Sequence, residues 1–269
     1  MNATIQISRN MTTVFNISIK EISFNHQTQT FNLHTMALSN NDSNVLSALF
    51  DPEASLSRNA PIDDSLISPT ESEAQTLIQS KEEQALRSIN VSKPTLSNVE
   101  QSISTLTNII QTHPSYASAR VNRAQARRLI YKDEELISQP SMAQQILEDL
   151  SEAIRLVTPS TPEESISRTN ARVLASAHTH RGYLLLLASK SDDNRKMLND
   201  TVGLKSLSLQ ELEEAASREL ASGGRYGNET ARQLAVMTNP YAKLCGSIVK
   251  EALTKEISDY YQFQVPLAR

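Results

Sequence analysis

The chain has 269 residues, enough to bury a sizeable core, and its formal net charge of −4 gives it no overall attraction to nucleic acid or to anionic lipid. Its single cysteine, Cys245, excludes an internal disulfide and fits a reducing compartment. The sequence contains no run of about 18 apolar residues, the length needed to span a bilayer. We therefore expect a cytoplasmic protein, with the nucleus as the alternative, and neither nucleic acid nor a membrane as its partner.

The beginning of the chain is rich in Ser, Thr and Asn, and we predict that residues 1–40 are disordered. Residues 1–35 are interpreted as an extension upstream of Met36 without a structural role. Residues 41–70 are predicted to form a short amphipathic helix at 44–50 and a linker.

From residue 71 onward the pattern is helical, because helix-forming residues dominate and Gly and Pro are confined to short breaks. We predict an all-α, short helical solenoid in which residues 71–226 form three helix pairs. Polar insertions interrupt the pairs at 132–141 and 191–207, and residues 227–269 are predicted to form C-terminal capping helices.

A small–large–small spacing at +0, +4 and +7 recurs in the second helix of each predicted pair. The three sets are Ser102, Leu106 and Ile109; Ile146, Leu150 and Ala153; and Ser208, Leu212 and Ala215. Three such sets in tandem, each behind an amphipathic helix, favour a solenoid of repeats. Gly223 and Gly224 are interpreted as the end of the sixth helix.

The helix predicted at 115–131 resembles the first helix of a tetratricopeptide (TPR) unit in its segment NRAQARRL at 122–129. Four segments together resemble the tetratricopeptide repeat protein 36 family, namely VLSALFDP at 45–52, ASARVNRAQARRL at 117–129, LEDL at 147–150 and NPYAKLC at 239–245. The resemblance implies three TPR units, a C-terminal cap, no catalysis, and a protein partner of the Hsp70 chaperone type.

TPR proteins that hold the acidic C-terminus of a chaperone resemble one another in five residues of a concave groove, which supply charge-assisted donors to two carboxylates. Asn122 matches the position in the third helix. The first helix departs from the pattern, since Ala85 follows Lys81 by four residues, and the fifth helix has Ser176 and His180 where Lys and Arg are expected. The sequence therefore keeps one of the five clamp positions.

The predicted partner-binding groove is lined by polar and aromatic residues of the third and fifth helices: Asn122, Gln125, Arg128, His180 and Tyr183. Arg128 would supply positive charge for an acidic peptide, and protonation of His180 would add to it. Arg123 and Arg127 are interpreted instead as structural partners of Glu148, Asp149 and Glu152 on the next helix.

No pattern of catalytic, cofactor-binding or metal-binding residues is recognised, so we expect neither an enzyme nor a cofactor. His178 and His180, two residues apart on a helix, point to different sides and cannot hold one metal ion there. Cys245 is predicted to be a buried small apolar residue of the last cap.

Two functions remain open from the sequence. The first is a non-enzymatic adaptor that binds a protein partner through the predicted groove. The second is a helical scaffold subunit of a larger complex that makes its contacts through the two insertions and the helix at 44–50.

Overall fold

The computed structural model describes residues 59–63, 65–66 and 73–264. In this part of the chain the fold is all-α, and β-type pairing is limited to a single bridge between Ile62 and Ile166. The predictions for residues 1–40 and for the helix at 44–50 lie outside the described residues. None of the described helices is long and apolar enough to cross a membrane.

The first helix pair consists of α3 (Glu73–Ile89) and α4 (Leu96–Thr112). Thr95 caps α4, because its hydroxyl accepts a hydrogen bond from the backbone N–H of Asn98. The predicted small–large–small set of α4 is buried, with Leu106 fully inaccessible to solvent.

The second pair consists of α5 (Ala117–Ile130) and α7 (Pro140–Val157), joined by the short helix α6 (Asp133–Ile137). Proline stands at the first position of α7, where its missing N–H costs nothing. The insertion predicted at 132–141 therefore contains a helix of its own, and Leu136 anchors it because this side chain is completely buried in the main core.

The third pair consists of α8 (Arg168–Ala188) and α10 (Leu209–Arg225). Between them lie α9 (Asp192–Arg195) and the 3₁₀-helix η2 (Lys196–Leu198), whose Met197 and Leu198 are fully buried. Helix α8 is buried almost all round, because α7 packs on one side of it and α10 on the other.

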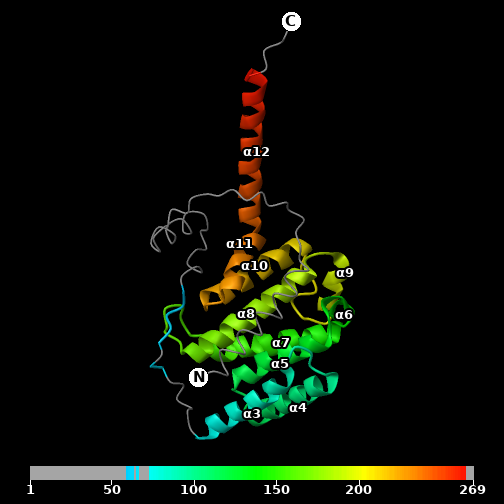
Figure 1. The fold of residues 1–269 in the computed structure, drawn as a ribbon, viewed down its shortest axis with the longest axis vertical. Helices are drawn as coiled ribbons and strands as arrows, with labels where there is room; N and C mark the ends of the chain where they lie inside the picture. Colours follow the sequence, from blue (N-terminus) through cyan, green and yellow to red (C-terminus); the bar gives the residue numbers. More distant parts are fainter. Residues whose placement is uncertain (1–58, 64, 67–72, 265–269) are drawn as a thin grey trace.

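The pairs stack in chain order, from α3 and α4 at one end through α5, α7 and α8 to α10 and α11 at the other (Figure 1). The largest buried cluster runs through the middle of this stack and joins α5, α6, α7, α8 and α10. The predicted all-α helical solenoid is confirmed.

The third pair has a different register from the predicted one. Ser208 is the N-cap of α10, where its hydroxyl accepts a hydrogen bond from the N–H of Glu211. The buried small–large–small set is Ala216, Leu220 and Gly223, eight residues further along. The predicted set fitted the spacing, but its first position is occupied by a capping residue outside the helix.

Gly223 and Gly224 do not end α10, which continues to Arg225. They allow neighbouring helices to approach closely: a Cβ atom on Gly223 would lie 2.6 Å from Thr179 Oγ1 of α8, and one on Gly224 would lie 2.9 Å from Arg232 Cα of α11. The turn after α10 uses Gly227 instead, whose φ of 100° is open to glycine and strained for other residues.

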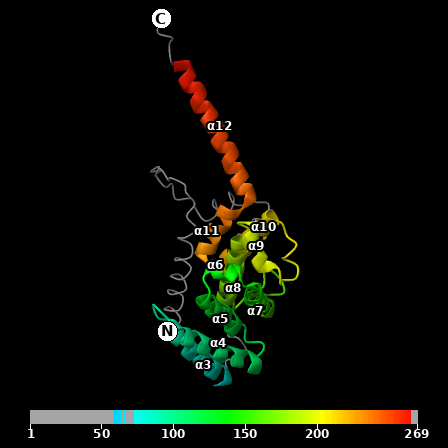
Figure 2. The ribbon, with the colours of Figure 1, turned by 90° about the vertical axis from the view of Figure 1, so that its right-hand side faces the viewer.

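Helices α11 (Glu229–Thr238) and α12 (Pro240–Gln264) follow. Helix α11 packs on α10 through Ala231 and Ala235, as a cap would. Helix α12 does not cap the array: it projects away from the body (Figures 1 and 2), and its side chains from 244 to 259 are exposed. Cys245, predicted to be buried, is exposed for this reason.

Part of the predicted linker lies on the body. The N–H of Ala60 donates to the carbonyl of Arg225 (3.0 Å), and the N–H of Ile166 donates to the carbonyl of Pro61 (3.0 Å). Ala60 is buried in a small cluster with Ile166 and Leu174. Residues 59–63 are therefore a docked segment, which joins the N-terminal part of the chain to the end of the third pair.

Ala124 and Ala153 are both completely buried at contacts between helices of the main core. Replacing either by Leu is expected to overpack this contact and to lower the free energy of unfolding by roughly 1–3 kcal/mol. Urea denaturation measures the change, with Gln145→Leu, an exposed position on α7, as the control. An unchanged midpoint for both variants would contradict the packing described here.

Candidate functional site: a polar cluster between α5 and α8

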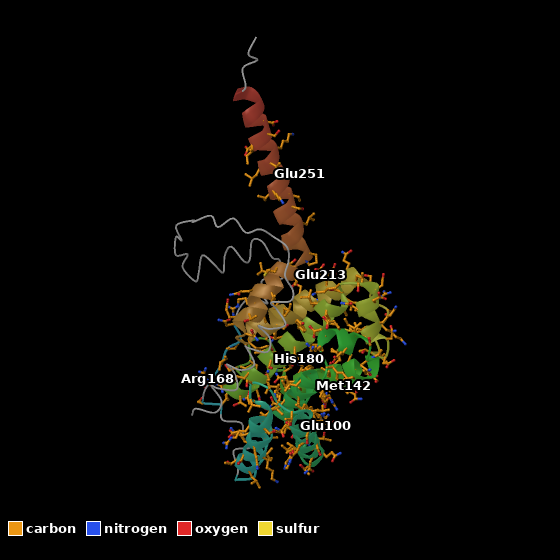
Figure 3. The ribbon with its side chains drawn as sticks, turned by 45° about the vertical axis from the view of Figure 1, so that its right-hand side comes forward. Glu100, Met142, Arg168, His180, Glu213 and Glu251 are labelled. Atoms are coloured by element: carbon orange, nitrogen blue, oxygen red, sulfur yellow. The ribbon has the colours of Figure 1, made fainter. Side chains whose placement is uncertain are left out.

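Two polar stripes bring four of the five predicted groove residues together. On α5, Asn122, Gln125 and Arg128 recur every three residues, and the apolar residues between them pack on α4 and α7. On α8, Ser176, His180 and Tyr183 stand at i, i+4 and i+7, so they share one face. The two stripes lie in neighbouring layers of the stack, and Figure 3 shows His180 within the body.

Asn122 does not belong to this cluster. Its side chain is 8% exposed, and its Nδ2 donates to Glu82 Oε1 of α3 at 2.7 Å. The hydroxyl of Tyr116 donates to the other oxygen of Glu82 at 2.6 Å. Burial raises the pKa of the Glu82 carboxyl, although these two hydrogen bonds act in the opposite direction. The one residue that matched a chaperone clamp is therefore used inside the fold.

Gln125 connects the two stripes directly, since its Nε2 donates to Ser176 Oγ of α8 at 2.8 Å. Ser176 stands where a clamp would have a lysine. The structure thus places a neutral hydrogen bond between helices at a position where the clamp would present charge to a partner.

Arg128 is held by a residue that sequence reasoning missed. Its Nη2 lies 2.5 Å from Asp133 Oδ1, and its guanidinium lies 5.3 Å from the centre of the Tyr183 ring, a cation–π distance. The hydroxyl of Tyr183 donates to the other oxygen of Asp133. Asp133 comes from α6, so the first insertion contributes to the site. Nothing in the sequence pairs it with Tyr183, 50 residues away.

We call Gln125, Arg128, Asp133, His180 and Tyr183 the α5–α8 cluster. His180 and Tyr183 are its most buried members, each at 2% exposure. Burial, and secondly the positive charge of Arg128, lower the pKa of the His180 imidazole to about 3. The expectation that protonated His180 adds positive charge is therefore wrong at neutral pH, because the imidazole stays neutral.

A pH dependence of stability follows from His180. The unfolded chain binds a proton near pH 6.5, whereas the folded chain binds one only near pH 3. Between these values the unfolded state holds more protons, so the free energy of unfolding falls as the pH is lowered from 6.5 towards 3. His180→Gln is expected to weaken this fall.

The measurement is urea denaturation of wild type and His180→Gln at several pH values. The raised pKa of Glu82 changes the free energy of unfolding in the opposite direction as the pH falls. Both proteins contain Glu82, so its contribution cancels when the free energy of unfolding of one is subtracted from that of the other. Parallel pH profiles for the two proteins would contradict the neutral, buried state of His180.

Arg123 and Arg127 of α5 have the structural role that the sequence suggested. Arg123 binds Asp149 of α7 with both Nε (2.8 Å) and Nη2 (2.6 Å), and Arg127 Nη1 lies 2.5 Å from the same carboxylate. Glu148 and Glu152, the other two predicted partners, bind residues of α7 itself, Gln144 and Arg155.

His178 belongs to a second polar contact, between α8 and α10. Its Nδ1 lies 2.9 Å from Glu219 Oε2, its ring stacks on Tyr226, and Arg181 binds the other oxygen of Glu219. His178 and His180 thus have separate surroundings, as their spacing predicted. In the described ranges no three His, Cys, Asp or Glu side chains gather as a metal site.

The α5–α8 cluster can hold a neutral hydrogen-bond acceptor more readily than a negatively charged carboxylate. The side chains of Arg128 and Asp133 are 13% and 20% exposed, and their charges compensate each other. Arg128 Nη1 is buried and has no hydrogen-bond partner among the described residues. A buried donor without an acceptor is costly, so an acceptor that reached this atom would stabilise the site.

Comparison with known proteins gives two relatives. The chain is 42% identical to the L-tyrosine degradation gene cluster protein hmgX of Aspergillus fumigatus over 243 residues, which cover 82% of this chain and 94% of that protein. It is 30% identical to tetratricopeptide repeat protein 36 of Danio rerio over 146 residues, which cover 54% of this chain and 56% of that protein. No protein-family model and no solved structure matches the chain.

The two relatives differ in what they support. The likeness to tetratricopeptide repeat protein 36 spans about half of each chain and supports a TPR-like relationship, which agrees with the stacked helix pairs. The sequence resemblance to that family was therefore too specific. The likeness to hmgX runs over nearly the whole of that protein at higher identity, so the chain belongs to the family of the L-tyrosine degradation gene cluster protein hmgX.

Proposed function

We propose that the protein is a non-enzymatic adaptor that binds a protein of L-tyrosine degradation through the α5–α8 cluster. The pathway is suggested by the name of the Aspergillus relative, and the interaction role by the TPR-like relationship. The observation that carries the proposal is the side chain of Arg128, which is 13% exposed and which Asp133 and Tyr183 hold in place, while its buried Nη1 lacks an acceptor among the described residues.

The cluster favours a particular kind of contact. Because Asp133 neutralises Arg128 and His180 is neutral, the cluster has little net charge. A backbone carbonyl or a side-chain amide of the partner fits such donors better than a terminal carboxylate, which Asp133 would repel. We therefore infer that the partner offers a neutral acceptor at Arg128.

An Hsp70-type chaperone is a less favoured partner. Its acidic tail requires several cationic and amide donors on one face. Asn122, the one matching residue, is bound to Glu82, and the charge of Arg128 is compensated. Binding to a chaperone would have to use another surface.

The scaffold-subunit alternative has less support from the insertions. Leu136 of the first insertion and Met197 and Leu198 of the second are fully buried. These three side chains fill the core of the array and are not available to a partner, whereas Val202 of the second insertion is 89% exposed.

The test is affinity purification of the tagged protein from cells of its own organism grown on L-tyrosine. Wild type is compared with the double variant Gln125→Ala, Arg128→Lys, which keeps the charge but loses the planar fork of the guanidinium. We expect the double variant to lose, at least tenfold, proteins of tyrosine degradation that wild type enriches. Arg155→Lys, an exposed position on α7, is the matched control.

Circular dichroism establishes that all three proteins are folded. Equal enrichment by wild type and the double variant would move the interface away from the cluster. Enrichment of chaperones alone, lost in the double variant, would replace the proposed partner by the chaperone.

A further inference from the structure

The end of the solenoid exposes large apolar residues on its outer side. Helix α11 covers α10, but on its own outer side Val236 and Met237 are 64% and 58% exposed, next to the exposed polar residues Glu229 and Gln233. Terminal repeats of a solenoid normally present a polar outer face to solvent. This end therefore lacks a cover within the described residues.

Helix α12 carries a matching apolar face. Its large apolar residues are between 52% and 58% exposed and comprise Leu244, Ile248, Val249, Leu253 and Ile257. Ser247, Lys250 and Thr254, at i, i+3 and i+7, form a polar stripe on another side of the helix. Over residues 244–253 the apolar side chains share a broad face that is suited to packing against another helix, and the exposed Lys255, Glu256 and Asp259 interrupt this face further along.

The link between α11 and α12 prevents the two faces from meeting within one chain. Helix α11 ends at Thr238 and α12 begins at Pro240, so Asn239 alone joins them. Asn239 is extended, with ψ of 118°, as expected for a residue before proline. Two antiparallel helices need a connection of about two to five residues, so α12 cannot fold back on its own α11.

We propose that α12 packs on the outer face of α11 in a second copy of this chain, and that the exchange is reciprocal in a two-fold dimer. A connection too short for folding back is a known route to exchange of an element between copies. The occupant is a second copy because each chain offers both halves of the contact, the uncovered face of α11 and the helix that its own link directs away. Figures 1 and 2 show α12 clear of the body from which it projects.

The first test is the molar mass of the full chain in solution, by light scattering after size exclusion at tens of micromolar. We expect twice the chain mass of 29.8 kDa. Ile248→Asp with Val249→Asp on α12, and Val236→Asp with Met237→Asp on α11, are each expected to give the single chain mass. Ser247→Asp with Thr254→Asp places the same charges on the polar stripe and is expected to leave the dimer intact.

The second test changes the link. Insertion of four residues, Gly-Ser-Gly-Ser, between Asn239 and Pro240 allows α12 to reach its own α11 and is expected to convert the dimer into a monomer. Thermal unfolding shows that the body of each variant is folded. A monomeric wild type would overturn the proposal and assign the apolar face to a different partner. A dimer that persists both after the insertion and after the α11 substitutions would also overturn the proposal, because its interface would have to lie on another surface of the chain.

Discussion

Asp149→Ala is expected to lower the free energy of unfolding by about 3–5 kcal/mol, because it leaves two largely buried arginine side chains without their counter-ion. The Asp149 side chain is 4% exposed and is shared by Arg123 and Arg127, whose side chains are 14% and 13% exposed. Burial, and further the charge of Arg123, lower the pKa of Arg127, whereas the charge of Asp149 raises it. Without Asp149 the two guanidinium groups repel each other and α5 separates from α7.

The measurement is urea denaturation at neutral pH. Glu152→Ala is the matched control on the same helix, since Glu152 pairs with the exposed Arg155 and is expected to have no measurable effect. A loss below about 1 kcal/mol for Asp149→Ala would show that the arginines find other acceptors or water, and that the shared carboxylate is not central to the α5–α7 contact.

Gly224→Leu is expected to cost roughly 3 kcal/mol, at the upper end of the usual range for overpacking. A Cβ at this position would lie 2.9 Å from both Cα and Cβ of Arg232 and 3.1 Å from its backbone N. Because these atoms belong to the backbone of α11 and its first side-chain atom, no rotamer change relieves the contact. Helix α11 has to move away from α10, which exposes Ala231 and Ala235.

Gly246→Leu is the control, because Gly246 lies in α12 and a Cβ added there would have no described atom within 4 Å. Leu favours a helix more than Gly does, by somewhat under about 1 kcal/mol, so the control is expected to gain stability or stay unchanged. Equal stability of Gly224→Leu and wild type would contradict the close approach of α10 and α11 and restore the interpretation of this glycine as a helix end.

Local properties of the sequence were enough to specify the helices and the stacking of pairs. High helix propensity, breaks at Gly and Pro, and the +0, +4, +7 spacing predicted the register of α4 and α7 correctly. They failed at α10 because a capping serine and a helix-interior small residue look alike in a spacing pattern. The close contacts of Gly223 with α8 and of Gly224 with α11 show which register of small residues faces the neighbouring helices.

The composition of the site was predicted in part. Gln125, Arg128, His180 and Tyr183 do lie together, because helical periodicity places them on facing stripes of α5 and α8. Their chemistry depends on contacts that form only in the folded chain. Asp133 reaches Arg128 through a small helix inside an insertion, and complete burial keeps His180 neutral. Asp133 is only five residues from Arg128, but the Tyr183 that completes the contact is 50 residues away. The burial of His180 likewise depends on packing between helices, which has no local signal.

The ends of the described chain show the same division. The capping helices predicted over residues 227–269 include α12, and helix propensity was sufficient to predict it. Its assignment as a cap, with Cys245 buried, was wrong, because an apolar face shows that a helix can pack but not on which surface. The single extended residue Asn239 before Pro240 directs α12 away from α11, and only the three-dimensional path of the chain reveals that the apolar face has been left exposed.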